Sequence, residues 1–425
     1  MPAAEMTAFA CPLPLGNSSV IYCFPEIGCR ESLPTRMPFG PTFAVKTSPR
    51  MLFDIFRKPK HIDLELLAQD HPAVRVSNLR KTFKKRVKGS GSKKKHDLTI
   101  TAVDDLSFTV PRGKILGLLG PNSSGKTTTM RCMATLSAPD SGSIQYYGID
   151  TVKEASTVRT MLGFVAQSAG LDKVLTGREH LELFGGLAHL DSREKQSNIE
   201  TLVELLDLED FIDRQTGVYS GGVIRRLDLA IALLHQPPIL ILDEPTVGLD
   251  IETRRVIWDV LQSWRDDGGT IILSSHYLEE VDILSDHIVI LEKGVMLAQG
   301  SSTELKASLG GDRITIRLNE FTTPEHAEAA CNVLKQRGLA QAAIVNRLQN
   351  NAVELVVDPH NATIGAEIVQ CLIEIGFERL FSFAQSKPSL DDVYLAATGR
   401  SLLDADVQAK EARSDKAVRQ ENMAK

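Results

Sequence analysis

The feature that most constrains this chain is a glycine-bounded loop, residues 120–125, between a short apolar run and a segment of helical composition. The apolar run, residues 114–119, is typical of a strand buried on both faces of a parallel sheet. From Thr127 the sequence is compatible with a helix as far as Leu136. Strand, loop and helix in this order predict an α/β fold with the loop at the start of a helix.

The residue types in this loop indicate that it binds phosphate. Backbone amides in such a loop converge on an anion, and the start of the following helix adds partial positive charge. Lys126 would reach the terminal phosphates of a nucleotide, and the hydroxyl of Thr127 is a candidate ligand of Mg²⁺. The alternative is an ordinary glycine turn between a strand and a helix, in which the presence of Lys126 and Thr127 would be a coincidence. By itself the motif predicts a nucleoside triphosphatase.

An acidic pair follows a second apolar run, residues 239–242. Asp243 and Glu244 stand at its carboxyl end, where open α/β sheets place their ligands. We expect Asp243 to hold Mg²⁺, directly or through water, and Glu244 to orient and polarise the attacking water. Acidic pairs at strand ends are more often capping residues. Here the sequence Pro-Thr-Val-Gly-Leu-Asp follows directly at residues 245–250, and the combination favours catalysis.

A second candidate anion site begins at Ser220, which is suited to cap a helix, and continues with Gly221 and Gly222. Glycines at a helix start let a phosphate approach bare backbone amides. Taken alone, this segment is more simply a capped helix with an apolar face. Gln167 and His276, which follow two further apolar runs, are equally uninformative alone. The order of all these elements along the chain carries the information.

In their order these motifs resemble the ATP-binding cassette (ABC) ATPases, and the resemblance runs from about Ala73 to Gln299. It implies ATP and Mg²⁺ as ligands, and a P-loop NTPase fold with a helical subdomain. It also implies a contiguous Walker A loop, whose nucleotide-binding residues are Gly120, Pro121, Asn122, Ser123, Ser124, Gly125, Lys126, Thr127 and Thr128.

The resemblance assigns catalytic and metal-binding roles as well. Asp243 and Glu244 form the Walker B pair, Gln167 is the Q-loop residue that meets Mg²⁺ and the membrane partner, and His276 is the switch histidine at the γ-phosphate. The catalytic residues are then Glu244, His276 and Gln167, and the metal-binding residues are Thr127, Gln167 and Asp243. Phe83 falls where these proteins stack an aromatic ring on adenine, although a single Phe near a strand end is more often a core residue.

A complete nucleotide site in this family needs two cassettes. Ser220, Gly221 and Gly222 form the signature that is presented to the nucleotide of the other subunit, and Asp250 ends the D-loop. The chain offers one phosphate loop and one signature. We therefore expect the working site to lie between two copies of this chain, which then acts as a homodimer.

Two positions depart from the usual family pattern. Most ABC loops have glycine where this chain has Ser123, and many signatures have Gln or Met where it has Val223. If the backbone at Ser123 needs a positive φ, a non-glycine residue costs on the order of 1 kcal/mol there. The minimal motif is present, so the sequence still predicts an ATPase, but it does not predict tight ATP binding.

Composition excludes several classes of function. The chain has 425 residues, more than one ordinary domain, and 43% hydrophobic residues, enough for large cores. Its formal net charge of -6 argues against nucleic acid as the main partner. No stretch approaches about 18 uninterrupted apolar residues, so we expect no membrane-spanning helix. If the function is transport, the pore belongs to separate membrane subunits.

The chain divides into four regions. Residues 1–70 are rich in proline and glycine and are expected to be a disordered extension, or the true start of the chain is Met51. Residues 71–305 form the ABC ATPase domain. Within it, the basic segment of residues 84–95 could contact anionic lipid but is more often a solvated hairpin tip. Thr176 and Glu179 form a predicted capping box that starts a helix in the mainly helical segment after Gln167.

Residues 312–399 have a different pattern, in which strands and helices follow the order βαββαβ. This order predicts a small α+β ferredoxin-like domain. The domain closes on residues 388–393, Pro-Ser-Leu-Asp-Asp-Val, which resemble the ending of the daunorubicin and doxorubicin exporter branch of the ABC ATPases. Residues 400–425 are charged, lack aromatic residues and are expected to be a disordered tail.

Together these features predict an ATPase subunit that powers a multisubunit exporter of drugs, polyketides, lipids or polysaccharides. It would lie at the cytoplasmic face of the membrane and be attached through separate transmembrane permease subunits. Two alternatives stay open: a soluble ABC ATPase outside transport, and a regulatory nucleotide-binding module with low turnover. The sequence does not identify the cargo, because substrate contacts belong to the permease.

Overall fold

The computed structural model describes residues 71–88, 95–168, 170–358, 361, 363–377, 380–398, 402, 405 and 406. These residues fall into two compact units. The small unit is Lys306–Ser389, and the large unit contains the described residues up to Leu305 and from Leu390 onward. The expected N-terminal extension, residues 1–70, lies outside the described residues, as does most of the expected tail, residues 400–425.

A six-stranded sheet in the order β10-β9-β3-β8-β7-β6 forms the centre of the large unit. Its strands are β3 (Ile115–Leu119), β6 (Leu162–Val165), β7 (Ile239–Asp243), β8 (Thr270–Ser275), β9 (His287–Glu292) and β10 (Val295–Gly300). All except β10 run parallel. Every residue of β3, β7 and β8 is buried, which explains their mainly apolar sequences.

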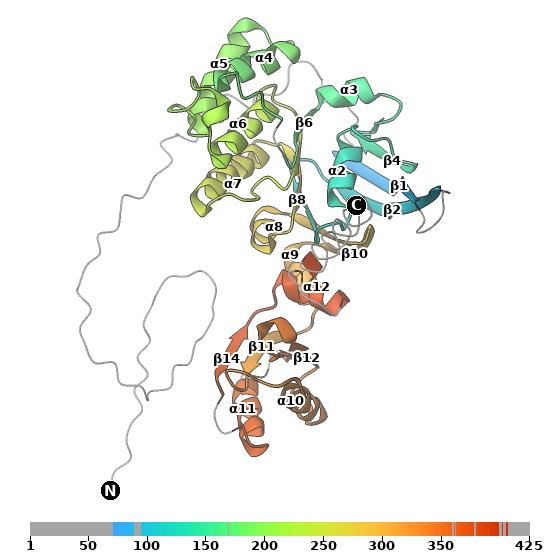
Figure 1. Ribbon diagram of the computed structural model, residues 1–425, viewed down its shortest axis with the longest axis vertical. Coiled ribbons are helices and arrows are strands. Elements are labelled where there is room, and N and C mark those ends of the chain that lie inside the picture. The colour runs from blue at the N-terminus through green and yellow to red at the C-terminus, as the bar shows by residue number, and fades with distance from the viewer. Residues whose placement is uncertain are drawn as a thin grey trace, which may run out of the picture. The chain divides into compact units, whose positions relative to one another are not determined.

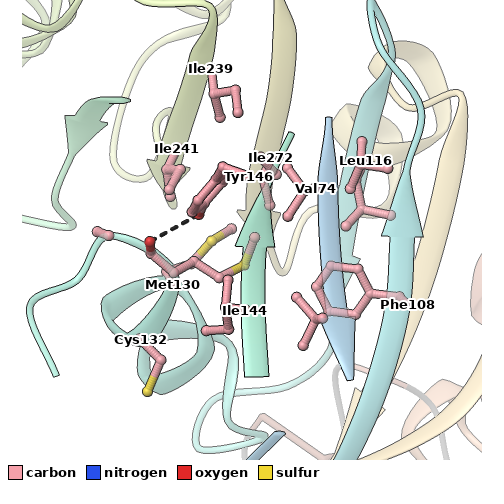
Figure 2. Close-up of a cluster of buried hydrophobic side chains, with 14 of the residues drawn as sticks. Val74, Phe108, Leu116, Met130, Cys132, Ile144, Tyr146, Ile239, Ile241 and Ile272 are labelled. Carbon is pink, nitrogen blue, oxygen red and sulfur yellow. Dashed lines mark hydrogen bonds between the residues drawn. The ribbon is translucent and has the colours of Figure 1, made fainter. Parts of the chain in front are cut away.

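An antiparallel sheet in the order β2-β1-β4-β5 shares a hydrophobic core with this central sheet. Its strands are β1 (Val74–Lys88), β2 (Lys95–Val110), β4 (Ser141–Tyr146) and β5 (Ile149–Asp150). Helix α2 (Lys126–Met133) contributes Met130 and Met133 to the core, together with side chains from both sheets (Figure 2). The hydroxyl of Tyr146 donates a hydrogen bond to the carbonyl of Met133 at 2.9 Å. These contacts fix α2, whose first turn completes the phosphate loop.

The basic segment between β1 and β2 continues their pairing. Lys84 pairs with Thr99, and the ladder runs on until Lys88 pairs with Lys95. The two strands therefore extend well into the segment that the sequence set apart as an insert. The tip of this hairpin, residues 89–94, lies outside the described residues.

Helices occupy the rest of the large unit. They are α3 (Ala155–Thr160), α4 (Gly177–Leu187), α5 (Ser192–Leu205), α6 (Gly221–Leu233), α7 (Ile251–Asp266), α8 (Leu278–Leu284) and α9 (Ser302–Ala307), with the 3-10 turn η1 (Thr216–Val218). Helices α4, α5 and α6 contact one another and form the expected helical subdomain (Figure 1). The predicted capping box is confirmed, because Thr176 accepts from the amide of Glu179 and the Glu179 side chain accepts from the amide of Thr176. No helix among the described residues is long and apolar enough to span a bilayer.

The small unit has the predicted order βαββαβ. Its elements are β11 (Asp312–Arg317), α10 (Pro324–Gln336), β12 (Ala342–Asn346), η2 (Arg347–Gln349), β13 (Ala352–Val357), α11 (Ile364–Glu374) and β14 (Ser382–Ser386). The strands pair antiparallel in the order β12-β13-β11-β14. Apolar residues from both helices and the sheet form a core of its own, including Ile314, Leu334, Leu355 and Ile368. This arrangement confirms the ferredoxin-like fold.

The end of the described chain belongs to the large unit. Helix α12 (Leu390–Thr398) buries Leu390, Val393 and Tyr394, and the unit also contains the buried residues Leu402, Ala405 and Asp406. The sequence analysis assigned α12 to the small domain and residues 400–425 to a disordered tail. The structure differs at these positions, because the spacing of Leu402 and Ala405 gives the short segment an apolar side that can be buried.

Candidate functional site

Four neighbouring strands of the central sheet bring the sequence-predicted residues to one edge. At their carboxyl ends, β3 leads into the phosphate loop, β8 into His276, β7 into Glu244 and β6, after one residue, into Gln167. Because the strands are parallel and adjacent, their carboxyl ends share this edge. Segments that are far apart in the sequence therefore meet in one site.

The phosphate loop follows β3 in a conformation that requires glycine at both ends. A Cβ on Gly120 would lie 2.3 Å from the carbonyl oxygen of Leu291, and one on Gly125 would lie 2.6 Å from that of Ala102. Gly125 also has a φ of 108°. Ser123, where the family usually has glycine, has a φ of 71° and is therefore left-handed. The expected departure is real at the level of the backbone, and its cost is on the order of 1 kcal/mol.

Lys126 is the cation of the site. Its Nζ donates to the carbonyls of Gly120 at 2.6 Å and Pro121 at 3.1 Å, and lies 3.6 Å from Oε1 of Glu244. Only 4% of the residue is exposed. Burial lowers its pKa, while the neighbouring carboxylates of Glu244, Asp406 and Asp243 oppose that effect. An anionic phosphate placed at this loop would meet a desolvated positive charge.

Thr127 and Asp243 provide oxygen ligands of the type that Mg²⁺ prefers. Thr127 Oγ1 lies within hydrogen-bond distance of Asp243 Oδ1, at 3.3 Å. Burial raises the pKa of Asp243, and its hydrogen bonds with Ser274 and Thr127 oppose that rise. A hydroxyl beside one carboxylate fits an ion that keeps several waters and binds substrate phosphates. Within the described residues no cluster of three His, Cys, Asp or Glu side chains that could hold a metal ion is present.

Glu244 lies at the centre of the site and is 4% exposed. Its Oε2 accepts a hydrogen bond from Nε2 of Gln167 at 3.0 Å, and its Oε1 lies 3.4 Å from Nδ1 of His276. Burial raises the pKa of Glu244, but His276, Lys126 and Gln167 outweigh burial and hold it below the usual value. The side chain is therefore a carboxylate near neutral pH, which is the form that can polarise a water molecule.

The sequence analysis missed two residues that hold this arrangement. Ser274 Oγ donates to Asp243 Oδ1 at 2.6 Å, and the backbone amide of Glu244 donates to the same hydroxyl at 3.0 Å. The available signal was a serine near the carboxyl end of an otherwise apolar run, and the structure shows that this serine is fully buried. Arg225 also went unremarked, because its partners are backbone carbonyls, which leave no trace in a sequence.

Arg225, on α6, is 7% exposed and binds the segments that carry Glu244 and Gln167. It donates to the carbonyls of Pro245 (2.7 Å), Glu244 (2.7 Å), Asp243 (3.0 Å) and Ala166 (2.5 Å), the residue before Gln167. Nη1 also lies 3.3 Å from Asp228 Oδ2. The planar guanidinium has five N–H donors, and this fork uses all of its nitrogens. Helix α6 is thereby bound to the backbone of Glu244 and of Ala166, the residue before Gln167.

The first two signature residues are exposed, while Gly222 packs closely against Thr253, because a Cβ on Gly222 would lie 3.1 Å from Oγ1 of Thr253. Ser220 caps α6 by accepting from the amide of Val223 at 3.4 Å. Ser220 and Gly221 are exposed, and nothing lies within 4 Å of a Cβ built on Gly221. Asp250 caps α7 in the same way, through the amide of Thr253. The start of α6 is thus open to a partner.

Phe83 lies outside the hydrophobic core. It is 47% exposed, and Nζ of Lys81 lies 5.7 Å from the centre of its ring. The alternative that Phe83 is a core residue is therefore wrong. Its stacking on adenine stays a prediction.

Comparisons with known proteins agree with this geometry. The family model described as "ABC transporter" matches residues 103–247. The daunorubicin resistance ATP-binding protein DrrA3 of Streptomyces coeruleorubidus is 41% identical over 70% of this chain and 91% of its own length. The linearmycin resistance ATP-binding protein LnrL of Bacillus subtilis is 34% identical over 72% of this chain and 96% of its own.

A solved structure described as an ATP-binding subunit of an ABC transporter aligns with a TM-score of 0.49 at 26% identity. The alignment covers 56% of this chain and 93% of that one. The identity to the full-length relatives decides the assignment. This chain belongs to the ABC transporter family and is one of its ATP-binding, ATP-hydrolysing subunits.

Proposed function

We propose that the chain powers a multisubunit exporter of drugs or similar natural products, such as polyketides, lipids or polysaccharides. It would act as a homodimer beneath separate transmembrane permease subunits, at the cytoplasmic face of the membrane. Two resistance ATP-binding proteins match it over most of their length, which supports export of a toxic compound. The permease would supply the pore and select the cargo.

The observation that carries this proposal is the set of contacts around Glu244. Its carboxylate is held from two sides by Gln167 and His276, and it lies near Lys126, which belongs to the phosphate loop. A water molecule that hydrogen-bonds to Glu244 would be polarised for attack on a phosphate bound at the loop. His276 and Gln167 would keep the carboxylate oriented during that step.

Thr127, Asp243 and Gln167 would hold Mg²⁺ together with the nucleotide phosphates. The ion would supply charge stabilisation at the oxygens between the phosphates. Lys126 binds the terminal phosphates, and the backbone amides of the loop hold the remaining oxygens. Ser274 fixes the Asp243 carboxylate for this task through the 2.6 Å hydrogen bond.

The open start of α6 supports the two-copy arrangement. Ser220, Gly221 and Gly222 would bind the γ-phosphate held by the partner, so ATP joins the two chains. Hydrolysis removes this bridge and lets the copies separate. The helical subdomain, which contains α6, would pass the motion to the permease.

A substitution of Glu244 tests the catalytic assignment. Glu244→Gln keeps the volume of the side chain but removes the charge that polarises water, so turnover should fall by about 10² to 10⁴. ATP binding should persist, and size-exclusion chromatography with ATP and Mg²⁺ should show a dimer. Glu182→Gln, the same change at an exposed position of α4, is the control and should keep wild-type turnover. Wild-type turnover in the Glu244 variant would rule out this role.

Steady-state turnover of the wild-type chain distinguishes the homodimeric ATPase from a regulatory nucleotide-binding module with low turnover. The left-handed φ of 71° at Ser123 favours a regulatory module if its strain weakens the loop. Such a module would bind ATP and show no turnover even when two copies associate. Turnover that rises with the square of protein concentration would support the homodimeric ATPase.

A further inference from the structure

The end of the described chain returns to the phosphate loop. Helix α12 anchors this return, because the hydroxyl of the fully buried Tyr394 donates to Glu292 Oε2 at 2.6 Å. Glu292 ends β9, which is next to β3 in the central sheet. The amide of Leu402 donates to Asp391 Oδ1 at 3.0 Å and ties the following residues to α12.

Asp406 contacts the loop itself. Its Oδ1 accepts a hydrogen bond from the backbone amide of Asn122 at 2.5 Å, and the residue is only 7% exposed. The Asp406 carboxylate also acts on Lys126, where it opposes the effect of burial on the pKa of the ammonium group. The carboxylate therefore accepts from one amide of the phosphate loop, that of Asn122, and adds negative charge to the surroundings of Lys126.

A carboxylate at this position satisfies an amide of the phosphate loop, that of Asn122, which a phosphate could otherwise use. The amides of such a loop serve nucleotide phosphates, and a carboxylate oxygen is an anionic acceptor of the same kind. In this arrangement Lys126 donates to the carbonyls of its own loop, Gly120 and Pro121. An arriving phosphate would need the Asn122 amide and would be repelled by the negative charge of Asp406.

We propose that Asp406 is an internal ligand of the phosphate loop, which ATP must displace before two copies of the chain can close on the nucleotide. The inference rests on the proposed function, since it concerns the same ATP site. Helix α12 keeps its own anchor at Glu292, so the displacement needs to involve only the residues after α12. The C-terminal segment thereby sets the apparent affinity for ATP.

The test is a titration of the full chain with a fluorescent ribose-labelled ATP analogue and Mg²⁺. Asp406→Asn keeps the shape of the side chain and removes its charge. The charged hydrogen bond in the wild type reduces the fraction of molecules whose loop is free to bind ATP. The variant weakens that bond, so its apparent Kd for the analogue should be about tenfold lower than that of the wild type. Asp404→Asn makes the same change in net charge two residues earlier and should leave Kd unchanged.

Each outcome decides something. Equal, measurable Kd values for wild type and Asp406→Asn would overturn the internal-ligand proposal and leave the proposed function standing. Absence of nucleotide binding in both proteins would overturn the proposed function as well. A lower Kd in both Asp variants would assign the effect to net charge and overturn the role of Asp406.

A second measurement uses the wild-type chain and does not depend on a variant that folds. If ATP displaces Asp406, hydrogen exchange at residues 402–406 should become faster when a non-hydrolysable ATP analogue, used in this measurement in place of the fluorescent one, binds. Exchange at α12 itself should stay slow, because its anchor to Glu292 is retained. Unchanged protection of residues 402–406 in the nucleotide-bound protein would contradict the displacement.

Discussion

Two non-glycine residues of the site have left-handed backbone conformations. Ser123 has a φ of 71° and Glu244 a φ of 51°. Such residues cost free energy that the surrounding contacts must offset. For Glu244 the compensation is visible, because its amide and carbonyl are bound by Ser274 and Arg225. The unusual backbone at Glu244 turns its side chain toward Gln167 and His276, so the strain has a use in the site.

Ser123→Gly tests the cost of the departure in the phosphate loop. Glycine adopts the left-handed conformation without strain, and the free energy gained in this way should exceed the cost of a more flexible unfolded chain. The free energy of unfolding should therefore rise by about 0.5 kcal/mol. Denaturant titration measures this difference. Ser124, the neighbouring serine, has no positive φ, so Ser124→Gly should lower stability instead. A loss of stability in Ser123→Gly comparable with that in the control would contradict the argument.

At the scale of elements, helix α6 joins two parts of the site. Its first residues are exposed, while Arg225, one turn further, donates to carbonyls on the segments that carry Glu244 and Gln167. A rotation of α6 would therefore move the backbone of Glu244 and the residue before Gln167 together. Arg225 acts through these backbone carbonyls, so we assign it the role of a positioning residue.

Arg225→Lys tests this link. Lysine keeps the charge but cannot reach four carbonyls with one ammonium group, so the variant should lose about 3 kcal/mol of stability. Its kcat should fall while the Kd for ATP stays near wild type, a split that general destabilisation would not produce. Asp228→Asn is the control, because it removes the ion pair and leaves the carbonyl contacts in place. Wild-type kcat in a folded Arg225→Lys protein would exclude the positioning role.

The elements differ in how far the sequence predicts them. Strands β3 and β7 are apolar and buried on both faces, so their carboxyl ends and the acidic pair could be located from the pattern alone. The alternation in the small unit likewise gave its element order. The sequence favours a hairpin at residues 84–95 but does not predict how far β1 and β2 extend into it, since Lys84 to Lys88 have no apolar alternation and depend on pairing with β2. The contact of Asp406 with Asn122 spans 284 positions and has no local signal at all.

At the scale of the whole molecule, the central question is whether one chain or two make the active site. The phosphate loop and Glu244 belong to one carboxyl edge, whereas Ser220 and Gly221 of the signature are exposed at the start of α6, with nothing within 4 Å of a Cβ built on Gly221. A symmetric pair of chains would complete two equivalent sites by exchanging signatures. This arrangement predicts complementation between two different inactive chains.

Gly221→Asp and Lys126→Ala together provide that test. The first places a negative charge where the partner's γ-phosphate would lie, and the second removes the cation of the phosphate loop. Each homodimer should be inactive, while mixed dimers contain one site with both halves intact. Turnover per mixed dimer should approach about half of the wild-type value if two equivalent sites act independently. Normal hydrolysis by the Gly221→Asp homodimer would show that each chain works alone.

The chain leaves the large unit at Leu305 and re-enters it at Leu390, so the small unit is an insertion with two covalent connections. In polymer terms it closes a loop, and the entropy of loop closure grows only slowly with loop length. Exchange of this insertion for another folded domain, or for a short flexible linker, therefore costs the ATPase little. A chain ended at Leu305 would instead lose Tyr394 from beneath Glu292 and Asp406 from the phosphate loop. Variation in this region should consequently favour replacement over truncation.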